Sequence, residues 1–350
     1  SDCIKKSWVS SSGEYVKLFE NEFSKYTGLK NCLSTSSGSS ALEIALSLCN
    51  LNELDEIIVP NLTFASPLNS AIRTKAKIVL VDVNKDNMCL NASEIIKKIN
   101  SKTKVIIVVN LYGFPVDIQK IRSTTPKEIL IIEDCAESLG SFRKQKHCGI
   151  WSDFATFSFF GNKTITTGEG GMLFCAKDED KEKALLLRDH GMSRSKKYWH
   201  EEIGFNFRIT NLQAAVGLAQ LERIEEILFN KREVFEKYFK YLSPYGFKFN
   251  QVDQDHVIDS KWLITLTHEN IKEYGVENLE YQLKLLGIDI RKVFYPLSSM
   301  PLYKEYCSCN YKNSNYLHNS YICLPSSPNL TTIQIKIISE KLIMLLGAKK

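Results

Sequence analysis

Short apolar runs rich in β-branched residues recur along the first two thirds of the chain and alternate with segments of helical character. The runs cover residues 56–60, 77–82, 104–110, 129–134, 154–159 and 171–175. Between them, apolar positions recur at helical spacing, as in residues 39–51 and 92–100. Continuous apolar strands alternating with helices are typical of a mostly parallel sheet covered on both faces. The pattern predicts an α/β fold that binds its ligand beyond the carboxyl ends of the strands.

The pattern changes in the last third of the chain. A charge-laced segment from Asn211 to about Tyr241 keeps helical spacing throughout, which predicts one long helix leaving the large domain. Two strand-like runs follow, residues 247–250 and 262–266, and a final amphipathic helix is predicted over residues 332–346. We therefore predict a large domain of residues 1–240 and a smaller C-terminal α+β domain of residues 241–350.

Composition and charge exclude two classes of protein. The 350 residues include 45 Lys and Arg against 40 Asp and Glu, a formal net charge of +5, and the basic residues are spread along the chain. No nucleic-acid partner is therefore expected. No stretch reaches the roughly 18 consecutive apolar residues of a membrane span, so no membrane association is expected.

The ten cysteines are dilute, and several lie in apolar runs, which predicts reduced, buried thiols. The Cys307-x-Cys309 pair has neither a second pair nor a histidine cluster nearby, so no metal site is expected. The first residues show no basic stretch followed by an apolar core. We therefore expect a cytoplasmic protein.

The segment from Thr156 to Gly171 carries the most chemical information. An apolar strand enters a polar loop that holds a single lysine, Lys163, and a glycine-rich turn precedes the next strand. A solvated lysine is the simplest alternative. Among small polar residues and glycines, however, a buried amine can lose its proton and attack a carbonyl group. A Schiff base with pyridoxal phosphate is one such use.

Pyridoxal phosphate needs a carboxylate beside its ring nitrogen, a phosphate site and an apolar surface against its ring. Asp134 ends a predicted strand and could supply the carboxylate, or it could cap the next helix. Residues 36–40 precede a helix that begins near Ala41, where free N–H groups could bind an anion, or the serines could cap the helix without a ligand. Phe64 also follows a strand, where it could cover the ring or pack in the core.

Five separated motifs join these residues in a recognisable order. They are Ser37-Gly38-Ser39-Ser40-Ala41-Leu42, Thr63-Phe64-Ala65-Ser66, Glu133-Asp134-Cys135-Ala136-Glu137-Ser138, Ser158-Phe159-Phe160-Gly161-Asn162-Lys163 with Thr167-Gly168-Glu169-Gly170-Gly171, and Gly204-Phe205-Asn206-Phe207-Arg208. In this order they resemble the sugar aminotransferases of the DegT/DnrJ/EryC1/StrS family over essentially the whole chain. The resemblance implies a fold-type-I pyridoxal phosphate aminotransferase, with a mostly parallel central sheet and a smaller C-terminal domain.

Within the family, the sequence is most similar to the 4-aminotransferases that act on nucleotide-linked 4-keto-6-deoxyhexoses, the perosamine-forming branch in particular. Further matching stretches are Trp8-Val9-Ser10-Ser11, Tyr198-Trp199-His200, Val293-Phe294-Tyr295-Pro296 and Leu324-Pro325-Ser326. That branch usually carries histidine two residues after the proline of its Phe-Tyr-Pro motif, whereas this chain has Ser298. The sugar epimer and the nucleotide base therefore stay open.

The resemblance also implies roles for individual residues. Lys163 forms the Schiff base and moves a proton between the cofactor carbon and C4 of the sugar. Asp134 pairs with the ring nitrogen, Phe64 stacks on the ring, and Glu137, where many relatives have glutamine, lies close to the cofactor or substrate.

The remaining implied roles concern the phosphate and the substrate. The phosphate is held by the backbone N–H groups of Gly38 and Ser39 and by the hydroxyl of Ser158, while Asn206 reaches the phosphate site of a neighbouring subunit. A homodimer with shared active sites follows. The residues implied to border the sugar nucleotide are Trp8, Tyr295 and Ser298.

The expected reaction begins when glutamate donates nitrogen to form pyridoxamine phosphate. That nitrogen then aminates a GDP-, UDP- or dTDP-linked 4-keto-6-deoxyhexose to give a 4-amino-4,6-dideoxyhexose of the perosamine or viosamine type. A sugar 3-dehydratase is one alternative, but it characteristically has histidine in place of Lys163. A regulatory protein without turnover is another. A nicotinamide-dependent Rossmann enzyme is disfavoured because no Gly-x-Gly-x-x-Gly motif follows the first strand.

Overall fold

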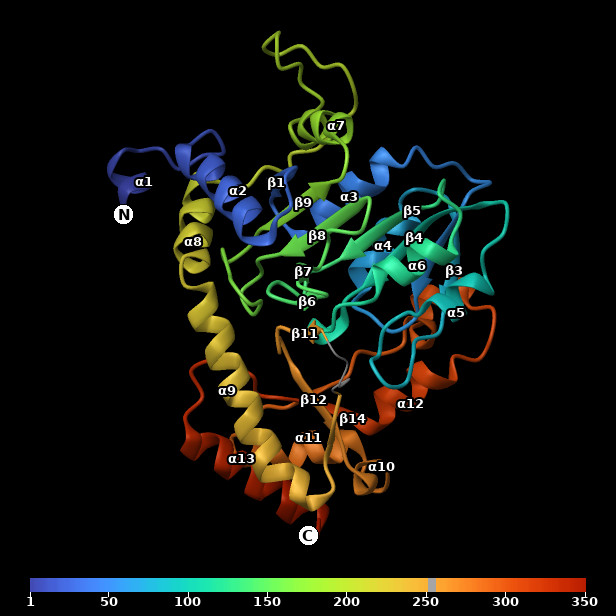
Figure 1. Cartoon of the computed structure of the whole chain (residues 1–350), viewed down its shortest axis with the longest axis vertical. Helices are drawn as coiled ribbons and strands as arrows, with labels where there is room; N and C mark the ends of the chain where they lie inside the picture. The colour runs from blue at the N-terminus through green and yellow to red at the C-terminus, as the bar shows by residue number, and fades with distance from the viewer. Residues whose placement is uncertain (251–255) are drawn as a thin grey trace.

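A seven-stranded sheet lies at the centre of the larger part of the molecule (Figure 1). The computed structural model describes residues 1–250 and 256–350. In spatial order the strands are β1 (Cys32–Thr35), β9 (Gly171–Cys175), β8 (Phe154–Ser158), β5 (Leu130–Asp134), β4 (Thr103–Val109), β2 (Glu56–Pro60) and β3 (Lys77–Val81). The five strands from β8 to β3 are parallel, whereas β9 runs antiparallel to both of its neighbours. The predicted α/β fold is confirmed; strand β1 was not predicted.

Helices cover both faces of this sheet. Because side chains alternate along a strand, Leu33 and Leu173 enter one hydrophobic core, and their neighbours Cys32 and Met172 enter the other. Helix α3 (Gly38–Leu48) contributes to the first core, and helices α2 (Glu14–Thr27) and α8 (Asn211–Leu221) contribute to the second. Alternating burial therefore fixes which face each helix covers.

The remaining elements of this part are short. The helices are α1 (Asp2–Lys5), α4 (Ala65–Ile72), α5 (Ala92–Ile96), α6 (Ile118–Thr124), α7 (Asp178–Arg188) and the 3-10 turn η1 (Leu111–Gly113). Strands β6 (Phe142–Arg143), β7 (Lys146–His147) and β11 (Val257–Ile258) form a small separate sheet.

The long helix predicted from Asn211 to about Tyr241 is two helices, so that prediction was wrong in part. Helix α8 ends at Leu221, and α9 (Ile224–Leu242) begins after a turn at Glu222 and Arg223. The ψ angle of Arg223 is 13°, outside the helical range, so the two helices do not form one continuous rod. The apolar spacing in the sequence continues across the turn because each of the two helices buries one apolar face.

The smaller part is built on a second sheet. Its order is β10 (Lys248–Phe249), β12 (Ile264–Thr267), β14 (Tyr321–Leu324) and β13 (Arg291–Lys292), all antiparallel. Around it lie α10 (Glu269–Tyr274), α11 (Val276–Leu285), α12 (Lys312–Ser320), α13 (Thr332–Leu346) and the 3-10 turns η2 (Ser243–Tyr245), η3 (Leu297–Ser299) and η4 (Pro301–Tyr306). Its core includes Val234 and Phe235 of α9. The domain boundary at residue 240 stays a prediction.

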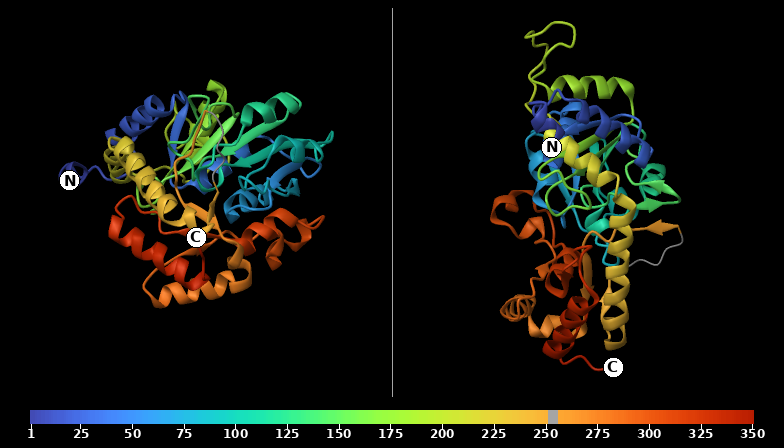
Figure 2. Two further views of the ribbon diagram at one scale, coloured as in Figure 1. Left: turned by 60° about the horizontal axis from the view of Figure 1, so that its bottom comes forward. Right: turned by 90° about the vertical axis from the view of Figure 1, so that its left-hand side faces the viewer.

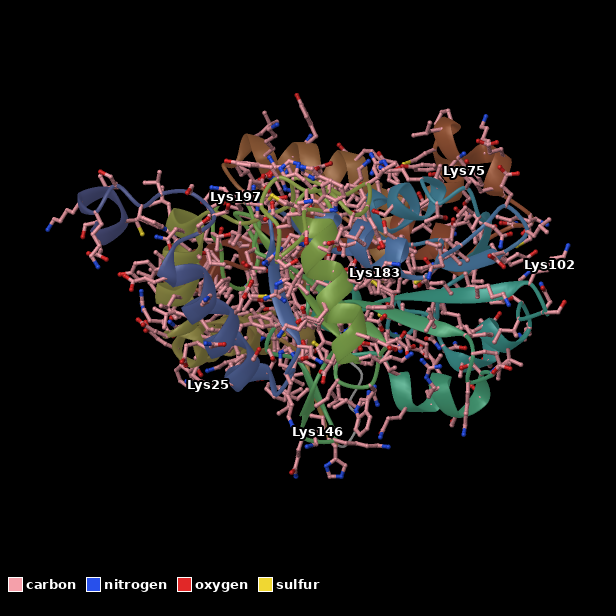
Figure 3. The ribbon with its side chains drawn as sticks, turned by 90° about the horizontal axis from the view of Figure 1, so that it is seen from above. Lys25, Lys75, Lys102, Lys146, Lys183 and Lys197 are labelled. Carbon is pink, nitrogen blue, oxygen red and sulfur yellow. The ribbon has the colours of Figure 1, made fainter. Side chains whose placement is uncertain are left out.

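Two surface features bear on function. The segment after α7 projects from the rest of the molecule (Figures 1 and 2). The six labelled lysines lie well apart from one another, in agreement with the dispersed charge of the sequence (Figure 3). Across the described residues no helix is long and apolar enough to cross a membrane, and all ten cysteines are free thiols.

Candidate active site

Several of the residues predicted to bind the cofactor lie at one edge of the seven-stranded sheet. Thr35, Gly171 and Ser158 form one row across β1, β9 and β8, and Asp134 ends β5. Lys163 lies five residues beyond the end of β8. Since β1, β8 and β5 run in the same direction, the residues that follow them meet at their carboxyl ends, where α/β sheets bind ligands.

Lys163 is mostly buried, with 13% of its side chain exposed. Its Nζ lies 3.6 Å from Oε1 of Glu137 and 3.9 Å from the centre of the Trp262 ring. The backbone N–H of Lys163 donates to the carbonyl oxygen of Phe160 at 3.0 Å, which closes the loop after β8. The amine is therefore paired and shielded, and the solvated alternative is wrong.

Two buried carboxylates follow β5. Asp134 accepts a hydrogen bond from the backbone N–H of Ala136 at 2.9 Å, and no helix begins in the residues after it, so the helix-cap alternative is wrong. Burial raises the pKa of Asp134, against the opposing effects of Ala136 N–H and Lys163. Glu137 accepts from the Tyr112 N–H at 2.8 Å, and burial raises its pKa to about 6.

A buried polar network supports this turn from behind. Glu133, Cys135 and Cys148 lie close enough together to share a metal ion. The two carboxylate oxygens of Glu133 already accept from Asn110 Nδ2 at 2.7 Å and from the Gly149 N–H at 2.9 Å, and burial raises its pKa to about 8. The group therefore serves as a hydrogen-bonded support for the end of β5.

The start of α3 faces the end of β8. Ser37 caps the helix and accepts from the Ser40 N–H at 3.0 Å, while Gly38 and Ser39 occupy the first two helical positions. N–H groups at those positions have no acceptor within the helix. A Cβ on Gly38 would lie 3.0 Å from Cβ of Ser158, so a larger residue here would press the start of α3 away from β8 by a few tenths of an ångström. The arrangement suits an anion such as phosphate.

Four aromatic rings line the edge in a row. Trp262 stacks on Tyr112, with ring centres 6.1 Å apart and planes at 13°, and Tyr112 stacks on Phe294 at 5.4 Å. Phe64 follows at 5.8 Å from Phe294 and is 59% exposed. Core packing therefore does not explain Phe64, which presents an open aromatic surface beside the start of α4.

Three residues were predicted to border the sugar nucleotide: Ser298, Tyr295 and Trp8. The Ser298 N–H donates to Oδ1 of Asn61, which follows β2, so Ser298 lies at this edge. Tyr295, which is 49% exposed, packs its ring 4.2 Å from that of His318. Trp8 is half exposed, and its carbonyl oxygen accepts from Asn211 at the start of α8.

Asn206 lies on a different strip of backbone. It pairs with Asp189, and its neighbour Phe207 accepts a hydrogen bond from the Ser36 N–H at 2.8 Å. The side chain of Asn206 is exposed. Among the described residues no hydrogen bond or ring contact joins Trp8 or Asn206 to Lys163.

Sequence reasoning missed Tyr112 and Trp262. Tyr112 has a left-handed backbone with φ of 55°, which nothing in its surrounding sequence indicates. Trp262 reaches Lys163 from about 100 residues further along the chain. Asn61 and Thr63 were also missed; Nδ2 of Asn61 and Oγ1 of Thr63 are buried with no hydrogen-bond partner among the described residues. Unpaired buried polar atoms are uncommon, and a ligand bound at this edge would supply their partners.

Comparison with known proteins agrees with the sequence resemblance. The family model of the DegT/DnrJ/EryC1/StrS aminotransferases matches residues 1–343. The GDP-perosamine synthase of Vibrio cholerae is 36% identical over 343 residues, covering 97% of this chain and 92% of that protein. The GDP-perosamine synthase of Escherichia coli O157:H7 is also 36% identical, over 98% of this chain and 93% of that protein.

Solved structures share the fold. Helicobacter pylori PseC, an aminotransferase involved in the biosynthesis of pseudoaminic acid, has a TM-score of 0.93 at 24% identity and covers 99% of this chain and 94% of its own. A mutant of the GDP-4-keto-6-deoxymannose-3-dehydratase ColD with bound GDP-perosamine has a TM-score of 0.89 at 22% identity, with 99% and 95% covered. The fold is therefore common to an aminotransferase and a dehydratase. Individual side chains of the site, and not the fold, must determine which reaction takes place.

Proposed function

The chain belongs to the DegT/DnrJ/EryC1/StrS aminotransferase family, and on that premise we propose that it aminates C4 of a nucleotide-linked 4-keto-6-deoxyhexose. Pyridoxal phosphate is the cofactor and glutamate the amino donor. The observation that carries the proposal is the buried Lys163 amine, held 3.6 Å from Glu137 at the edge where Asp134 and the start of α3 also lie.

The residues at this edge fit pyridoxal phosphate. Gly38 and Ser39 would bind the phosphate through N–H groups at the start of α3, and Ser158 through its hydroxyl. The buried Asp134 carboxylate would keep the ring nitrogen protonated, and a cation there would favour the ionised carboxylate against the effect of burial. Phe64 would cover one face of the ring. When bound, the cofactor would carry the amino group and withdraw electrons from the adjacent carbon.

Lys163 would then act as the base and acid of the transfer. A neutral amine at Nζ could take a proton from the cofactor carbon on one side of the transferred nitrogen and deliver it to C4 of the sugar on the other side. Glu137 lies where it can stabilise the resulting ammonium. The low exposure of Lys163 and Glu137, 13% and 5%, limits exchange of that proton with water.

Lys163 also separates this proposal from the dehydratase, since that enzyme characteristically has histidine at this position. For the substrate, the names of the two perosamine relatives favour GDP-4-keto-6-deoxymannose over the UDP and dTDP analogues. Ser298 stands where the perosamine branch usually has histidine. The identity of the sugar is therefore a proposal that the experiment below tests. A cytoplasmic location stays a prediction.

A homodimer with shared sites is part of the proposal. Asn206 exposes its side chain, so it is accessible to the phosphate site of a second copy of the chain. The projecting segment after α7 exposes 78% of Tyr198 and 97% of Ile203. Such apolar side chains on a protruding segment support contact with another subunit.

The test is to incubate the protein, loaded with pyridoxal phosphate and glutamate, with GDP-4-keto-6-deoxymannose and with the UDP- and dTDP-4-keto-6-deoxyglucose analogues. We expect a 4-amino product from one of them, and the GDP sugar most strongly. Lys163→Ala should lose at least about 100-fold in rate, because the proton-transfer group is gone. Loss of a sugar hydroxyl without amination would instead indicate the dehydratase reaction.

A further inference from the structure

Trp262 lies beside the amine of Lys163 and has no part in the proposed reaction. It precedes β12 in the smaller part of the molecule and is 3% exposed. Nζ of Lys163 lies 3.9 Å from the centre of its ring. An ammonium over the face of an indole ring is attracted by the ring's electron density, most strongly where water is excluded.

Two contacts hold the indole ring, and a third holds the backbone of Trp262. Its Nε1 donates to the carbonyl oxygen of Asn162 at 2.8 Å, which ties the ring to the residue before Lys163. Tyr112 stacks on the ring, and the Trp262 carbonyl oxygen accepts from Nζ of Lys231 at 3.1 Å. The ring therefore keeps its place relative to the lysine loop and does not depend on a ligand for its orientation.

Glu137 completes the surroundings of the amine. Its Oε1 is 3.6 Å from Nζ of Lys163, and its Oε2 accepts from the Tyr112 N–H at 2.8 Å. Tyr112 thus holds the carboxylate with its backbone and the indole with its ring. Its φ of 55° is a conformation that a tyrosine seldom adopts unless its surroundings enforce it.

We propose that Glu137 and Trp262 together form a binding site for the Lys163 ammonium, occupied in the cofactor-free protein and when pyridoxamine phosphate is bound without substrate. The inference rests on the proposed function. When Nζ bonds to the aldehyde carbon of pyridoxal phosphate, the aldehyde oxygen leaves as water and the free ammonium is lost. Pyridoxamine phosphate has no aldehyde and leaves the ammonium in place. The site therefore favours pyridoxamine phosphate over pyridoxal phosphate.

The experiment compares the dissociation constants of the two compounds on cofactor-free protein. In Trp262→Leu, the preference for pyridoxamine phosphate should fall by about 2- to 30-fold, the range for a cation on an aromatic face. Trp262→Phe keeps an aromatic ring at this position, so its preference for pyridoxamine phosphate should fall less than that of Trp262→Leu. Trp151→Leu, which removes a half-exposed indole from the loop before β8, should leave the preference unchanged.

Glu137→Gln provides a second route if Trp262→Leu does not fold. The amide keeps an acceptor for Tyr112 but removes the charge, so the preference should fall in the same direction. If Trp262 and Glu137 had a purely structural role, their substitution would weaken the binding of both compounds equally. In a Lys163→Ala background, where there is no ammonium to bind, Trp262→Leu should leave the preference unchanged.

Two results would overturn the inference. One is an unchanged preference in both Trp262→Leu and Glu137→Gln, and the other is an equal change in the Lys163→Ala background. Wild-type protein that binds neither compound would instead overturn the proposed function, and this inference with it. If only the ammonium site is wrong, the wild type binds both compounds and the variants keep the wild-type preference.

Discussion

Lys231 is a buried cation whose environment makes a quantitative prediction. It lies on the inner face of α9, 4% exposed, and Nζ donates to the carbonyl oxygens of Trp262 and Ser326, both at 3.1 Å. Both acceptors are neutral. Burial lowers the pKa of Lys231 from its ordinary value of 10.5 to about 8.

The sign of the effect follows from proton binding. Between about pH 8 and about pH 10.5 the unfolded chain still holds the Lys231 proton, whereas the folded protein has lost it. The unfolded state therefore binds more protons, and the free energy of unfolding rises with pH across this window. A gap of about 2.5 pH units, at about 1.4 kcal/mol per unit, is worth about 3 kcal/mol.

The perturbation is Lys231→Met, which keeps an unbranched apolar chain and removes the titration. We expect the free energy of unfolding of the wild type to rise relative to that of the variant by up to about 3 kcal/mol between about pH 7 and about pH 10.5. Urea unfolding followed by circular dichroism at several pH values measures the difference. Lys240→Met, at an exposed position on the same helix, is the matched control. Parallel pH profiles for wild type and Lys231→Met would refute the reasoning.

Three further predictions concern the site. Gly171→Ala would place Cβ 2.4 Å from the Ser37 carbonyl oxygen. The start of α3 must then move. A binding titration should show the affinity for pyridoxamine phosphate falling by about 1–3 kcal/mol. Because burial raises the pKa of Glu137 to about 6, its charge is lost as the pH falls through that value. The kcat/KM profile should have an acid limb near pH 6 that Glu137→Gln lacks. Asn206→Ala should weaken pyridoxal phosphate binding by about 1–3 kcal/mol, and subunit exchange with Lys163→Ala protein should restore part of the activity.

The parallel strands could be predicted because their apolar runs are continuous and end in polar residues. Asp134 is recognisable because it ends such a run, and Lys163 because it lies in the polar loop after one. Strand β1 could not be predicted in the same way, since Cys32–Thr35 is only four residues long and pairs with β9 from the other half of the large domain. The break before α9 was missed because apolar spacing continues across Arg223.

The surroundings of Lys163 depend on contacts that local sequence does not encode. Trp262 reaches the amine only because the smaller part of the molecule packs against the sheet edge. Tyr112 adopts its left-handed backbone because Glu137 and the neighbouring rings hold it there. Lys231 did leave a signal, since a lysine between the buried residues Leu228 and Val234 of α9 interrupts an apolar helix face.

The proposed function requires the amine of Lys163 to bond to the cofactor. Loading the protein with pyridoxal phosphate, reducing it with borohydride and mapping the peptides by mass spectrometry measures this directly. We expect a phosphopyridoxyl group on the peptide that contains Lys163, and none in Lys163→Ala. The group on a different lysine of the wild type, or bound cofactor with no modified lysine after reduction, would contradict it.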